Sequence, residues 1–411
     1  MPNIEEVQAI VVGGGIVGTS ILYWLSRLGW KDITLLERRN LTSGSTWHAA
    51  GNVTHFGHYT AITNLYVNSL KTYKAASSES GQEIDFHQTG SLRLANSEEE
   101  LRAYENLKPV YKSIDAAYEV VEPKEIERLH PLLEIDGVFG AAHTPEDGHV
   151  DPTSATHALA KAARLRGAEV KINSPVMDIR PSNGKWIVTT EMADYRAKRV
   201  VIATSFWARE MLSPLGLNMP IYPVQHHEVR TSSIPELEAL GFEVPAVRDP
   251  YAPSNTRQEK NGFLCGVYES NPQFWATEGI PPDFQEELLA PDPERLEAHL
   301  LRVIERIPAF GEAGIEAINN GPMAYTPDGL PMLGPVESHP GLWLAAGFNI
   351  GIGTGGGAAE YLSHWMHNGV PEYELPIVYP SRYANDISTE TALAQIHSTY
   401  AKGYVMPDVS A

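Results

Sequence analysis

Three glycines near the start of the chain, Gly13, Gly15 and Gly18, have the G-x-G-x-x-G spacing of a dinucleotide-binding turn. In such a turn the first glycine permits the tight bend, the second lets the backbone approach a pyrophosphate, and the third allows the next helix to pack closely on the strand. That helix begins with Ile16 and Val17, and the positive end of its dipole stabilises phosphate charge. The spacing therefore predicts that the chain binds a dinucleotide.

An acidic residue stands where the same site needs one. Glu37 follows the glycines by roughly 20 residues, and a carboxylate there accepts hydrogen bonds from the ribose 2′-OH. It would repel a 2′-phosphate, which disfavours NADP. Arg38 follows directly, and we include it in the predicted cofactor site. The spacing alone does not choose between FAD and NAD.

Predicted strands and a helix hold these residues in place. Val7–Val12 is an apolar run typical of a buried strand, and Ile16–Leu28 carries apolar residues at helical spacing. Gly29 is positioned to end the helix, and Ile33–Leu36 is a second apolar strand that leads to Glu37. Strand, glycine turn, helix and strand follow in the order that a Rossmann-like site requires.

A second group of residues indicates flavin chemistry. The segment Ser45-Thr46-Trp47-His48-Ala49-Ala50-Gly51 resembles the flavin-attachment segment of the dimethylglycine dehydrogenase and sarcosine dehydrogenase family, within the D-amino-acid-oxidase-like flavoproteins. The resemblance spans nearly the whole chain. It also includes Thr89-Gly90-Ser91-Leu92-Arg93, Asp147-Gly148-His149-Val150-Asp151-Pro152, Tyr222-Pro223-Val224-Gln225-His226, Thr326-Pro327-Asp328-Gly329-Leu330-Pro331 and Gly347-Phe348-Asn349-Ile350-Gly351-Ile352.

The resemblance implies that FAD is the cofactor and that His48 is joined covalently to the 8α-methyl group of the flavin. A neutral imidazole is nucleophilic, and a covalent tether prevents loss of the cofactor and makes the flavin more oxidising. The same resemblance assigns flavin contacts to residues around His48, namely Gly44, Ser45, Thr46, Ala50 and Gly51.

Later segments are implied to complete the cofactor site. A strand over Val170–Ile179 would bring the backbone near Val176 to the adenine, and an apolar strand over Arg199–Ala203 leads to Trp207. Relatives usually have glycine just after the alanine, whereas this chain has Thr204. We therefore expect the close backbone approach to the cofactor to be shifted here.

A glycine run near the end of the chain is the last predicted part of the cofactor site. It follows a predicted strand, Leu342–Ala346, and leads into a helix expected from Ala358. In the family this segment brings backbone amides and a helix N-terminus toward the flavin pyrimidine edge, where donors stabilise the negative charge of reduced flavin. The residues assigned to this contact are Gly351, Ile352 and Gly353.

The catalytic residue implied by the resemblance is His226, in the motif Pro223-Val224-Gln225-His226 on a predicted strand, Ile221–Thr231. We expect it to position the substrate and to help remove a proton from the amine. A histidine packed in the core is the alternative interpretation. His227 should point to the opposite face of a regular strand.

Further residues are candidates for substrate binding. Arg257 could pair with a substrate carboxylate in bidentate fashion or with an acidic residue of the protein. Tyr325 could line the pocket or pack in the core. Asn255 stands where relatives usually have tyrosine, and Glu228 where they have an aromatic residue. These departures make dimethylglycine itself a doubtful substrate.

Composition excludes several classes of protein. The chain has 411 residues, of which 43% are hydrophobic, enough for a substantial core and two or three domains. Its 31 Lys+Arg against 51 Asp+Glu give a net charge of −20, which opposes binding to nucleic acid and to anionic membranes. No apolar run reaches the roughly 18 residues of a membrane span. The first strand begins too close to Met1 for a signal peptide.

The single cysteine, Cys265, lies in the apolar stretch Phe263–Val267 and is expected to pack in a strand. A catalytic thiol is the alternative, but no neighbouring basic group supports it. A chain without an internal disulfide fits a reducing, cytoplasmic location. We predict no metal site.

The expected fold is α/β, with a Rossmann-like FAD-binding domain interleaved with a mixed-sheet α+β substrate domain. Predicted elements of the substrate domain are the helices Ser97–Val110 and Pro293–Ile307 and the strand Phe263–Tyr268. In long members of the family the tail leads into a folate-binding aminomethyltransferase domain, and this chain stops there. The predicted pieces are residues 1–85, 145–220 and 325–370 for FAD, 86–144 and 221–324 for substrate, and 371–411 for a helical tail.

The reaction implied by the resemblance is oxidation of an N-methylated amine or amino acid by hydride transfer to flavin N5, giving the demethylated amine and formaldehyde. Oxygen or an electron-transfer flavoprotein is the acceptor. Two alternatives stay open. One is an amino-acid oxidase that releases ammonia and a keto acid, and the other is a flavin-carrying subunit that works only with a separate folate-binding chain. The identity of the product and the activity of the isolated chain distinguish them.

Overall fold

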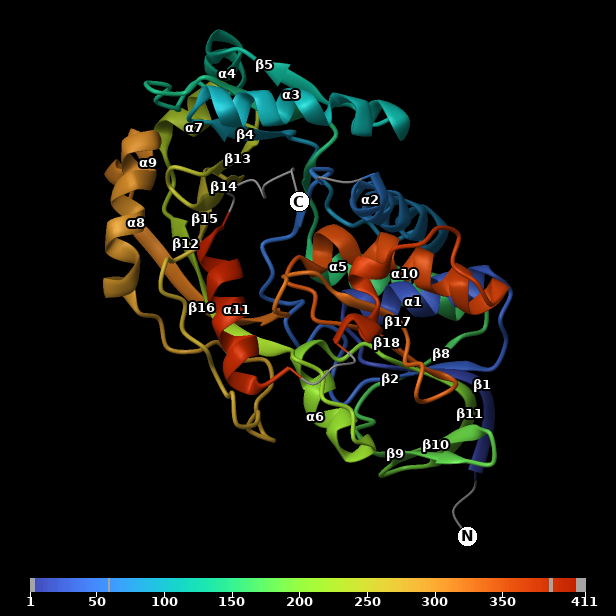
Figure 1. The fold of residues 1–411 in the computed structure, drawn as a ribbon. Helices are drawn as coiled ribbons and strands as arrows, with labels where there is room; N and C mark the ends of the chain where they lie inside the picture. Colours follow the sequence, from blue (N-terminus) through green and yellow to red (C-terminus); the bar gives the residue numbers. More distant parts are fainter. Residues whose placement is uncertain (1–3, 58–59, 384–386, 404–411) are drawn as a thin grey trace.

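The computed structural model describes residues 4–57, 60–383 and 387–403. Within these residues the chain forms two eight-stranded sheets, each covered by its own helices (Figure 1). A short two-stranded ribbon, β3 (Asn52–Val53) with β7 (Gly148–His149), lies where the chain passes from one sheet to the other. The chain crosses between the sheets several times, so segments far apart in sequence meet at their junction.

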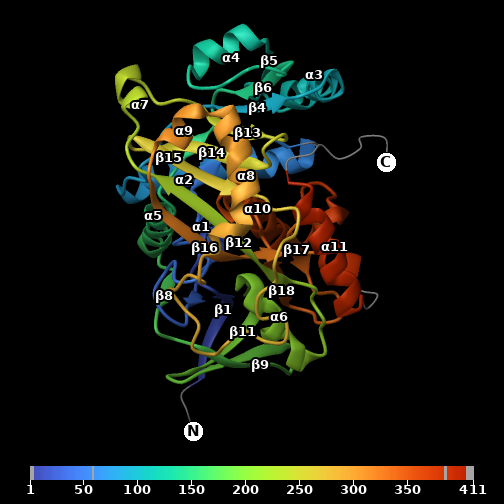
Figure 2. The ribbon, with the colours of Figure 1, turned by 90° about the vertical axis from the view of Figure 1, so that its left-hand side faces the viewer.

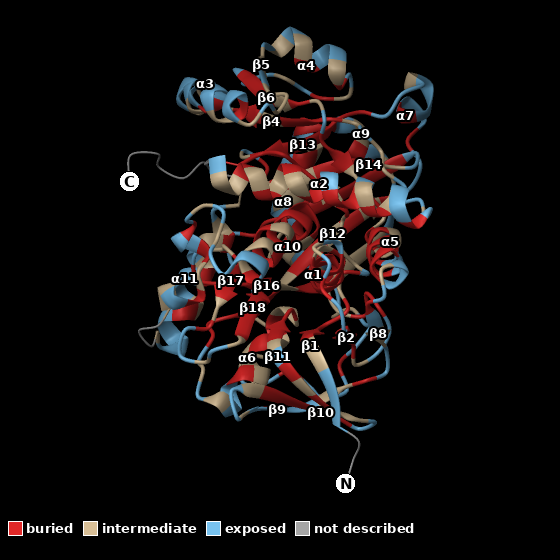
Figure 3. Cartoon of the chain, turned by 90° about the vertical axis from the view of Figure 1, so that its right-hand side faces the viewer, coloured by how far each residue is buried: buried red, intermediate tan, exposed pale blue. Residues whose placement is uncertain are grey.

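The first sheet contains the predicted dinucleotide-binding strands. Its central strand is parallel to both neighbours, as expected for strands buried on both faces. Figure 3 shows that this strand runs from an exposed start into the core. The strand order is β17 (Met332–Pro335), β18 (Leu342–Ala346), β11 (Asp194–Ile202), β1 (Ile4–Val12), β2 (Ile33–Leu36) and β8 (Glu169–Lys171), with β10 (Lys185–Thr190) paired to β11 and β9 (Val176–Ser182) paired to β10.

The helices beside this sheet pack against one another as one layer (Figure 1). Small residues bring them close together. A Cβ at Gly357 would lie 2.1 Å from the Leu65 carbonyl oxygen, so only glycine fits at that crossing. The layer consists of α1 (Ile16–Arg27), α2 (Thr60–Ser80), α5 (Pro152–Leu165) and α10 (Gly351–Asn368), and α6 (Ala208–Leu212) follows β11.

The second sheet is mixed, with mostly antiparallel pairs and one parallel pair. Helix α8 (Pro293–Arg306) lies across its outer face, as Figures 1 and 2 both show. The opposite face looks toward the first sheet and toward α11 (Thr389–Ala401). The strand order is β16 (Ile315–Tyr325), β12 (Tyr222–Thr231), β15 (Gly262–Val267), β14 (Ser254–Glu259), β13 (Ala246–Asp249), β4 (Ser91–Ala95), β6 (Gly140–Thr144) and β5 (Glu119–Val121).

The other helices are short or lie at the edges. The remaining α-helices are α3 (Glu98–Ser113), α4 (Pro123–Leu129), α7 (Pro235–Leu240) and α9 (Pro308–Glu312), and the 3₁₀ turns are Ser205–Trp207, Ser213–Leu215, Pro376–Val378 and Pro380–Tyr383. The two sheets draw their strands from the sequence segments expected for the FAD and substrate domains, and we propose those boundaries for the domains. No helix in the described part of the chain is long and apolar enough to cross a membrane.

Two sequence predictions need correction. The strand expected over Val170–Ile179 is divided into β8 and β9, because Asn173 adopts a left-handed conformation (φ 51°) and Pro175 cannot donate a ladder hydrogen bond. The helix expected from Ala358 begins seven residues earlier, at Gly351, inside the glycine run. There the glycines serve helix packing as well as the turn.

Candidate active site

A cavity of about 710 Å³ lies at the junction of the two sheets and extends from the glycine turn to β12 and β13. Its lining comes from both sheets, from the segment after β2, and from the start of α10. Most of the predicted cofactor-binding residues lie along it. Those that line the cavity are Gly13, Gly15, Ile16, Val17, Glu37, Arg38, Gly44, Ser45, Thr46, His48, Ala50, Gly51, Val176, Trp207, Gly351, Ile352 and Gly353.

The glycine turn has the tight geometry that its spacing predicts. Gly13 has φ +111°, and a Cβ there would lie 2.4 Å from the Ala203 carbonyl oxygen. Gly18 does not line the cavity. Its missing side chain lets α1 pack on the turn, because a Cβ would lie 2.0 Å from the Gly13 carbonyl oxygen. Both glycines thus stand where a side chain would collide with the backbone, and their part in binding a dinucleotide stays a prediction.

Glu37 holds the turn together from the end of β2. Its Oε2 accepts a hydrogen bond from the Gly14 amide at 2.7 Å, and its Oε1 accepts one from the Arg39 amide at 2.8 Å. Burial raises the pKa of this carboxyl, although the two amides oppose the shift. Ser43 Oγ also donates to Oε1, at 3.4 Å, so the second lone pair of Oε2 is the one to which a bound ribose hydroxyl can donate.

The start of α1 is suited to phosphate. Gly15 gives the helix no side-chain cap, and the Ile16 amide donates to Thr46 Oγ1 at 3.1 Å. Nearby, Thr204 Oγ1 lines the cavity and is buried with no hydrogen-bond partner in the described residues. A helix N-terminus and an orphaned hydroxyl along one cavity fit a bound dinucleotide.

Arg38 and Trp207 form the wall near β2. The Arg38 guanidinium lies 4.4 Å from the centre of the Trp207 ring, a cation–π distance. The same guanidinium donates to the Phe284 carbonyl oxygen at 2.5 Å. A loop of the second half of the chain is thereby fixed against the predicted cofactor site.

His48 lies farther along the same cavity, against β16. A Cβ at Gly321 would lie 2.5 Å from His48 Nδ1, so the imidazole packs directly on that glycine. Burial lowers the pKa of His48 to about 4. The imidazole is therefore neutral at physiological pH and its nitrogen lone pair is available as a nucleophile.

The start of α10 faces the cavity from the side of the first sheet. The helix has no side-chain N-cap, and residues Phe348 to Gly353 line the cavity. Its first amides are therefore available to donate hydrogen bonds to a negatively charged ligand, and the contact with the flavin pyrimidine edge stays a prediction.

His226 faces the cavity from β12. It is 7% exposed, and its Nδ1 lies 2.8 Å from the Tyr400 hydroxyl of α11. Burial, with smaller contributions from His227 and His48, lowers the pKa of His226 to about 3. The side chain stays neutral, with Nε2 near Gly266 and the cavity.

His227 points the other way, as predicted. Its Nε2 accepts a hydrogen bond from the Asp292 amide at 3.2 Å, so Nδ1 carries the proton. Nδ1 lies 3.1 Å from Glu269, which also binds Arg295 of α8. Cys265 is buried in β15 as expected, and burial raises the pKa of its thiol to about 12.

The predicted substrate residues lie in different surroundings. Asn255 lines the cavity, and its Oδ1 accepts from Asn52 Nδ2 at 3.1 Å. Arg257 does not line it. Its guanidinium donates to the Ala50 carbonyl oxygen at 2.9 Å and pairs with Glu259 at 2.5 Å. Tyr325 is buried in an aromatic cluster with Tyr400 and also lies outside the lining.

The cavity includes polar residues that sequence reasoning did not assign to the site. Arg248 of β13 is 6% exposed, and its Nη1 is buried with no partner among the described residues. Arg93 of β4 and Glu228 of β12 also line the cavity. Glu228 had been noted only as a departure from relatives, and Arg248 stands in no quoted motif.

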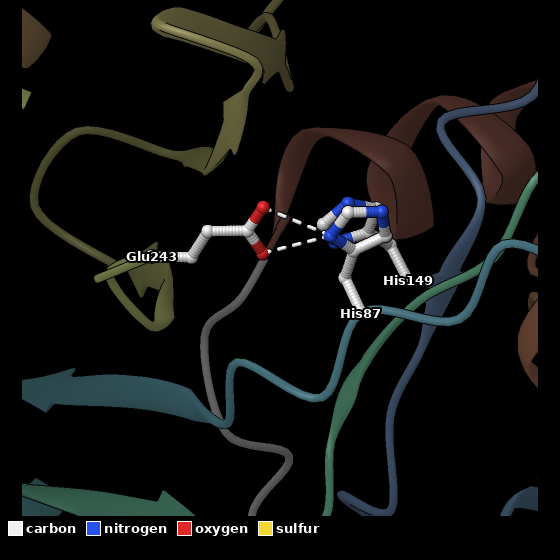
Figure 4. Close-up of side chains that lie close together, drawn as sticks. All are labelled: His87, His149 and Glu243. Atoms are coloured by element: carbon white, nitrogen blue, oxygen red, sulfur yellow. Dashed lines mark hydrogen bonds and ion pairs between the residues drawn. The ribbon is translucent and has the colours of Figure 1, made fainter. Parts of the chain in front are cut away.

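A cluster of possible metal ligands lies outside this cavity (Figure 4). His87 Nδ1 lies 2.8 and 2.9 Å from the two carboxylate oxygens of Glu243, and the rings of His87 and His149 stack with planes 8° apart. Imidazole lone pairs lie in the ring plane, so two parallel rings do not direct them at one point. The geometry is that of an ion pair beside a stacked ring.

Comparisons with known proteins give the chain its family. Residues 8–365 match the family described as FAD dependent oxidoreductase. Dimethylglycine dehydrogenase of Rattus norvegicus is 39% identical over 402 residues, 96% of this chain and 47% of the relative. Human sarcosine dehydrogenase is 31% identical over 413 residues, 98% of this chain and 44% of the relative. The chain thus spans about half the length of these curated relatives.

Solved structures share the architecture. L-proline dehydrogenase from P. horikoshii superimposes with a TM-score of 0.80 at 26% identity, covering 93% of this chain and 99% of that one. Glycine oxidase from Geobacillus kaustophilus gives a TM-score of 0.74 at 22% identity, covering 92% and 99%, and this likeness concerns the fold alone. The cavity begins at the glycine turn, and the family model matches most of the length of the chain. The protein therefore belongs to the FAD dependent oxidoreductase family.

Proposed function

We propose that this protein oxidises an N-methylated amine or amino acid with FAD, releasing the demethylated amine and formaldehyde. The observation that supports the proposal is that His48 and His226 lie close together. His226 is directly opposite Gly321 in the β12–β16 ladder, and the His48 imidazole packs on that glycine. The predicted tether and the predicted active-site histidine are thereby neighbours in one cavity.

The chemistry asks three things of the protein. The amine must be neutral when it reacts, because its nitrogen lone pair stabilises the iminium that forms as the C–H bond breaks. The reacting carbon must be held close to the flavin, and the cavity must exclude bulk water. FAD supplies the two-electron acceptor when bound. The iminium then takes up one water molecule and divides into the shorter amine and formaldehyde.

His226 fits a positioning role in this scheme. It is neutral, since burial lowers its pKa to about 3, and Tyr400 fixes its ring through Nδ1. The other nitrogen is left to hydrogen-bond the substrate. The relatives named dimethylglycine dehydrogenase and sarcosine dehydrogenase support an N-methyl amino acid as the class of substrate.

We also propose that His48 carries the flavin covalently. The imidazole is neutral, lies in the cavity, and is held between Trp47 and Gly321. The ring centroids of Trp47 and His48 are 5.4 Å apart and the planes are almost perpendicular. A ring fixed in this way presents one nitrogen in one direction, which favours a single site of attachment.

The test uses the purified flavoprotein without oxygen. Sarcosine, dimethylglycine and 4-(methylamino)butanoate are added in turn, and the loss of oxidised-flavin absorbance is recorded together with formaldehyde. We expect at least one of them to reduce the flavin with an equal amount of formaldehyde. Ammonia and a keto acid would instead identify an amino-acid oxidase, and no reduction by any N-methyl amine would contradict the proposal.

A further inference from the structure

Polar side chains form a continuous row across the second sheet, on the face that lines the cavity. The registers of neighbouring strands place Arg93 opposite Arg248, Arg248 opposite Asn255, and Asn255 opposite Gly266. Gly266 is opposite Glu228, and Glu228 is opposite Asn319. Every member of the row except Gly266 lines the cavity.

The row has opposite charges at its two sides. The arginines stand on β4 and β13, and Glu228 stands on β12, three strands from β13. Neighbouring strands are about 4.8 Å apart, so the backbones at Arg248 and Glu228 are separated by about 14 Å. Gly266 between them contributes no side chain. A Cβ there would lie 2.6 Å from Asn255 Nδ2 and 3.1 Å from His226 Nε2, so the glycine makes room for these two side chains beside the cavity.

The acidic side of the row adjoins the proposed reaction centre. Glu228 and His226 are two residues apart on β12 and therefore project to the same face, about 7 Å from each other. His226 is opposite Gly321, on which the His48 ring packs. A substrate with its nitrogen beside His226 is within reach of the Glu228 carboxyl.

We infer that Glu228 accepts the proton that the substrate's ammonium group must lose before oxidation, while Arg248 binds the carboxylate of the same substrate molecule. The inference rests on the proposed function, because it concerns how an N-methyl amino acid is held at that site. The step moves one proton from nitrogen to a carboxylate oxygen. It leaves a neutral amine beside His226 and a neutral carboxylic acid at Glu228.

The properties of the two candidate acceptors favour Glu228. Burial raises its pKa to about 7, with Arg257 opposing and Glu259 adding to the shift. The pKa of His226 is lowered to about 3. An alkylammonium group has an ordinary pKa of about 10, so transfer to Glu228 is less unfavourable than transfer to His226 by about four powers of ten.

The surroundings leave Glu228 available for this task. Arg257, the cation that lowers the pKa of Glu228, is committed to Glu259 and the Ala50 carbonyl oxygen. Besides His226, the titratable groups around Glu228 are Arg230 on its own strand, paired with Glu316 of β16, and the buried thiol of Cys265 on β15.

Arg248 is free for an anion. Its Nη1 is buried without a partner among the described residues, whereas the next residue, Asp249, faces away and binds Arg306 at 2.8 Å. A buried guanidinium nitrogen that lacks a protein partner is a strong site for a carboxylate oxygen.

The first experiment measures ligand binding to the flavoprotein. Glycine betaine carries a carboxylate and a permanent positive charge but no nitrogen lone pair, so it cannot be oxidised in this way. We expect its affinity for the wild-type protein to fall about tenfold per pH unit below pH 7, with uptake of the ligand releasing up to one proton. Calorimetry in buffers of different ionisation enthalpy measures that proton.

Variants separate the two side chains. Glu228→Gln should bind betaine with no proton release and no pH dependence, while Glu297→Gln, which removes an exposed carboxylate on α8, should behave as wild type. Arg248→Gln should lower the affinity for betaine by about tenfold or more, and it should leave the affinity for tetramethylammonium unchanged because that cation has no carboxylate. Arg302→Gln is its exposed control.

The second experiment follows turnover with the amine that the anaerobic test identifies. For Glu228→Gln, kcat/KM should rise about tenfold per pH unit up to the pKa of the amine, because only neutral amine reacts, and should approach the wild-type value near pH 10. If the ratio of the variant's kcat/KM to that of the wild type is the same at every pH, the inference is overturned. It is also overturned if betaine binds the wild type with an affinity that does not depend on pH. The two proposals can fail separately. If betaine binding releases a proton but no methylamine is oxidised, the proposed function is contradicted, whereas the role of Glu228 in binding a cation is not.

Discussion

The hydroxyl oxygen of Tyr400 lies 2.8 Å from Nδ1 of His226, although 174 residues separate the two in the chain. The ring centroid of Tyr268 lies 4.9 Å from that of His226 and 5.1 Å from that of Tyr400, so the histidine is held within an aromatic cluster. Helix α11 thus reaches the predicted reaction centre from the tail of the chain. It determines which nitrogen of His226 faces the cavity.

Tyr400→Phe should lower kcat/KM about three- to tenfold, because it removes one hydrogen bond worth about 1 kcal/mol and lets the imidazole rotate. The flavin absorbance spectrum should be unchanged. Steady-state kinetics and the spectrum together check this. Tyr379→Phe, which removes a hydroxyl that binds Tyr361 far from the cavity lining, is the matched control and should keep wild-type kinetics.

His48→Ala should abolish covalent flavin without unfolding the protein, because the ring packs on a glycine and its loss leaves only a small gap. Acid precipitation should leave the flavin with the wild-type protein and release it from the variant, and intact mass should show the same difference. Flavin released unchanged from the wild type would contradict the proposed tether.

Gly321→Ala should reduce the covalently bound fraction, because its Cβ would occupy the space of the His48 ring. The displacement of a buried ring by about an ångström is enough to misalign a reacting nitrogen. Gly314→Ala is the control, since a Cβ there meets only Ser232 Oγ at 3.4 Å. Equal covalent fractions in the two variants, measured by mass spectrometry, would argue against attachment at His48.

The stability of the protein should depend on Glu228 in a defined pH window. Its pKa is about 7 in the folded protein against 4.5 when unfolded, so the folded state holds this proton more tightly and loses stability as pH rises from about 4.5 to 7. Glu228→Gln lacks this effect. Between pH 5 and pH 8, the free energy of unfolding of the variant should therefore rise by about 1 to 3 kcal/mol relative to that of the wild type, as measured by urea denaturation. An unchanged difference across this window would show that folding does not raise the pKa of this carboxyl.

The fold and the cofactor half of the site could be predicted from sequence, because both depend on short-range patterns. The glycine spacing, the strand Ile33–Leu36 and the carboxylate at Glu37 lie within one strand–helix–strand unit, where backbone geometry dictates residue type. The β8–β9 break was missed because the apolar residues of 170–172 and 176–179 suggest one strand, although the polar turn residues Asn173 and Ser174 and then Pro175 stand between them.

The substrate half could not be predicted in the same way. Arg248 and Glu228 belong to one row only because four antiparallel strands pair in a particular register, which local sequence does not specify. Arg257 attracted attention by its motif, yet a neighbouring glutamate and a backbone carbonyl satisfy its guanidinium. The role of Tyr400 depends on where a terminal helix docks, which no pattern around that tyrosine indicates.

The pleat of β12 sends alternate side chains to different tasks: His226 and Glu228 face the cavity, and His227 fastens the strand to α8 through Glu269. A single inserted or deleted residue early in this strand would exchange the two sets. His227 would then face the cavity, and His226 and Glu228 would face α8. The spacing of this one strand is therefore far less tolerant of length changes than the loops around it.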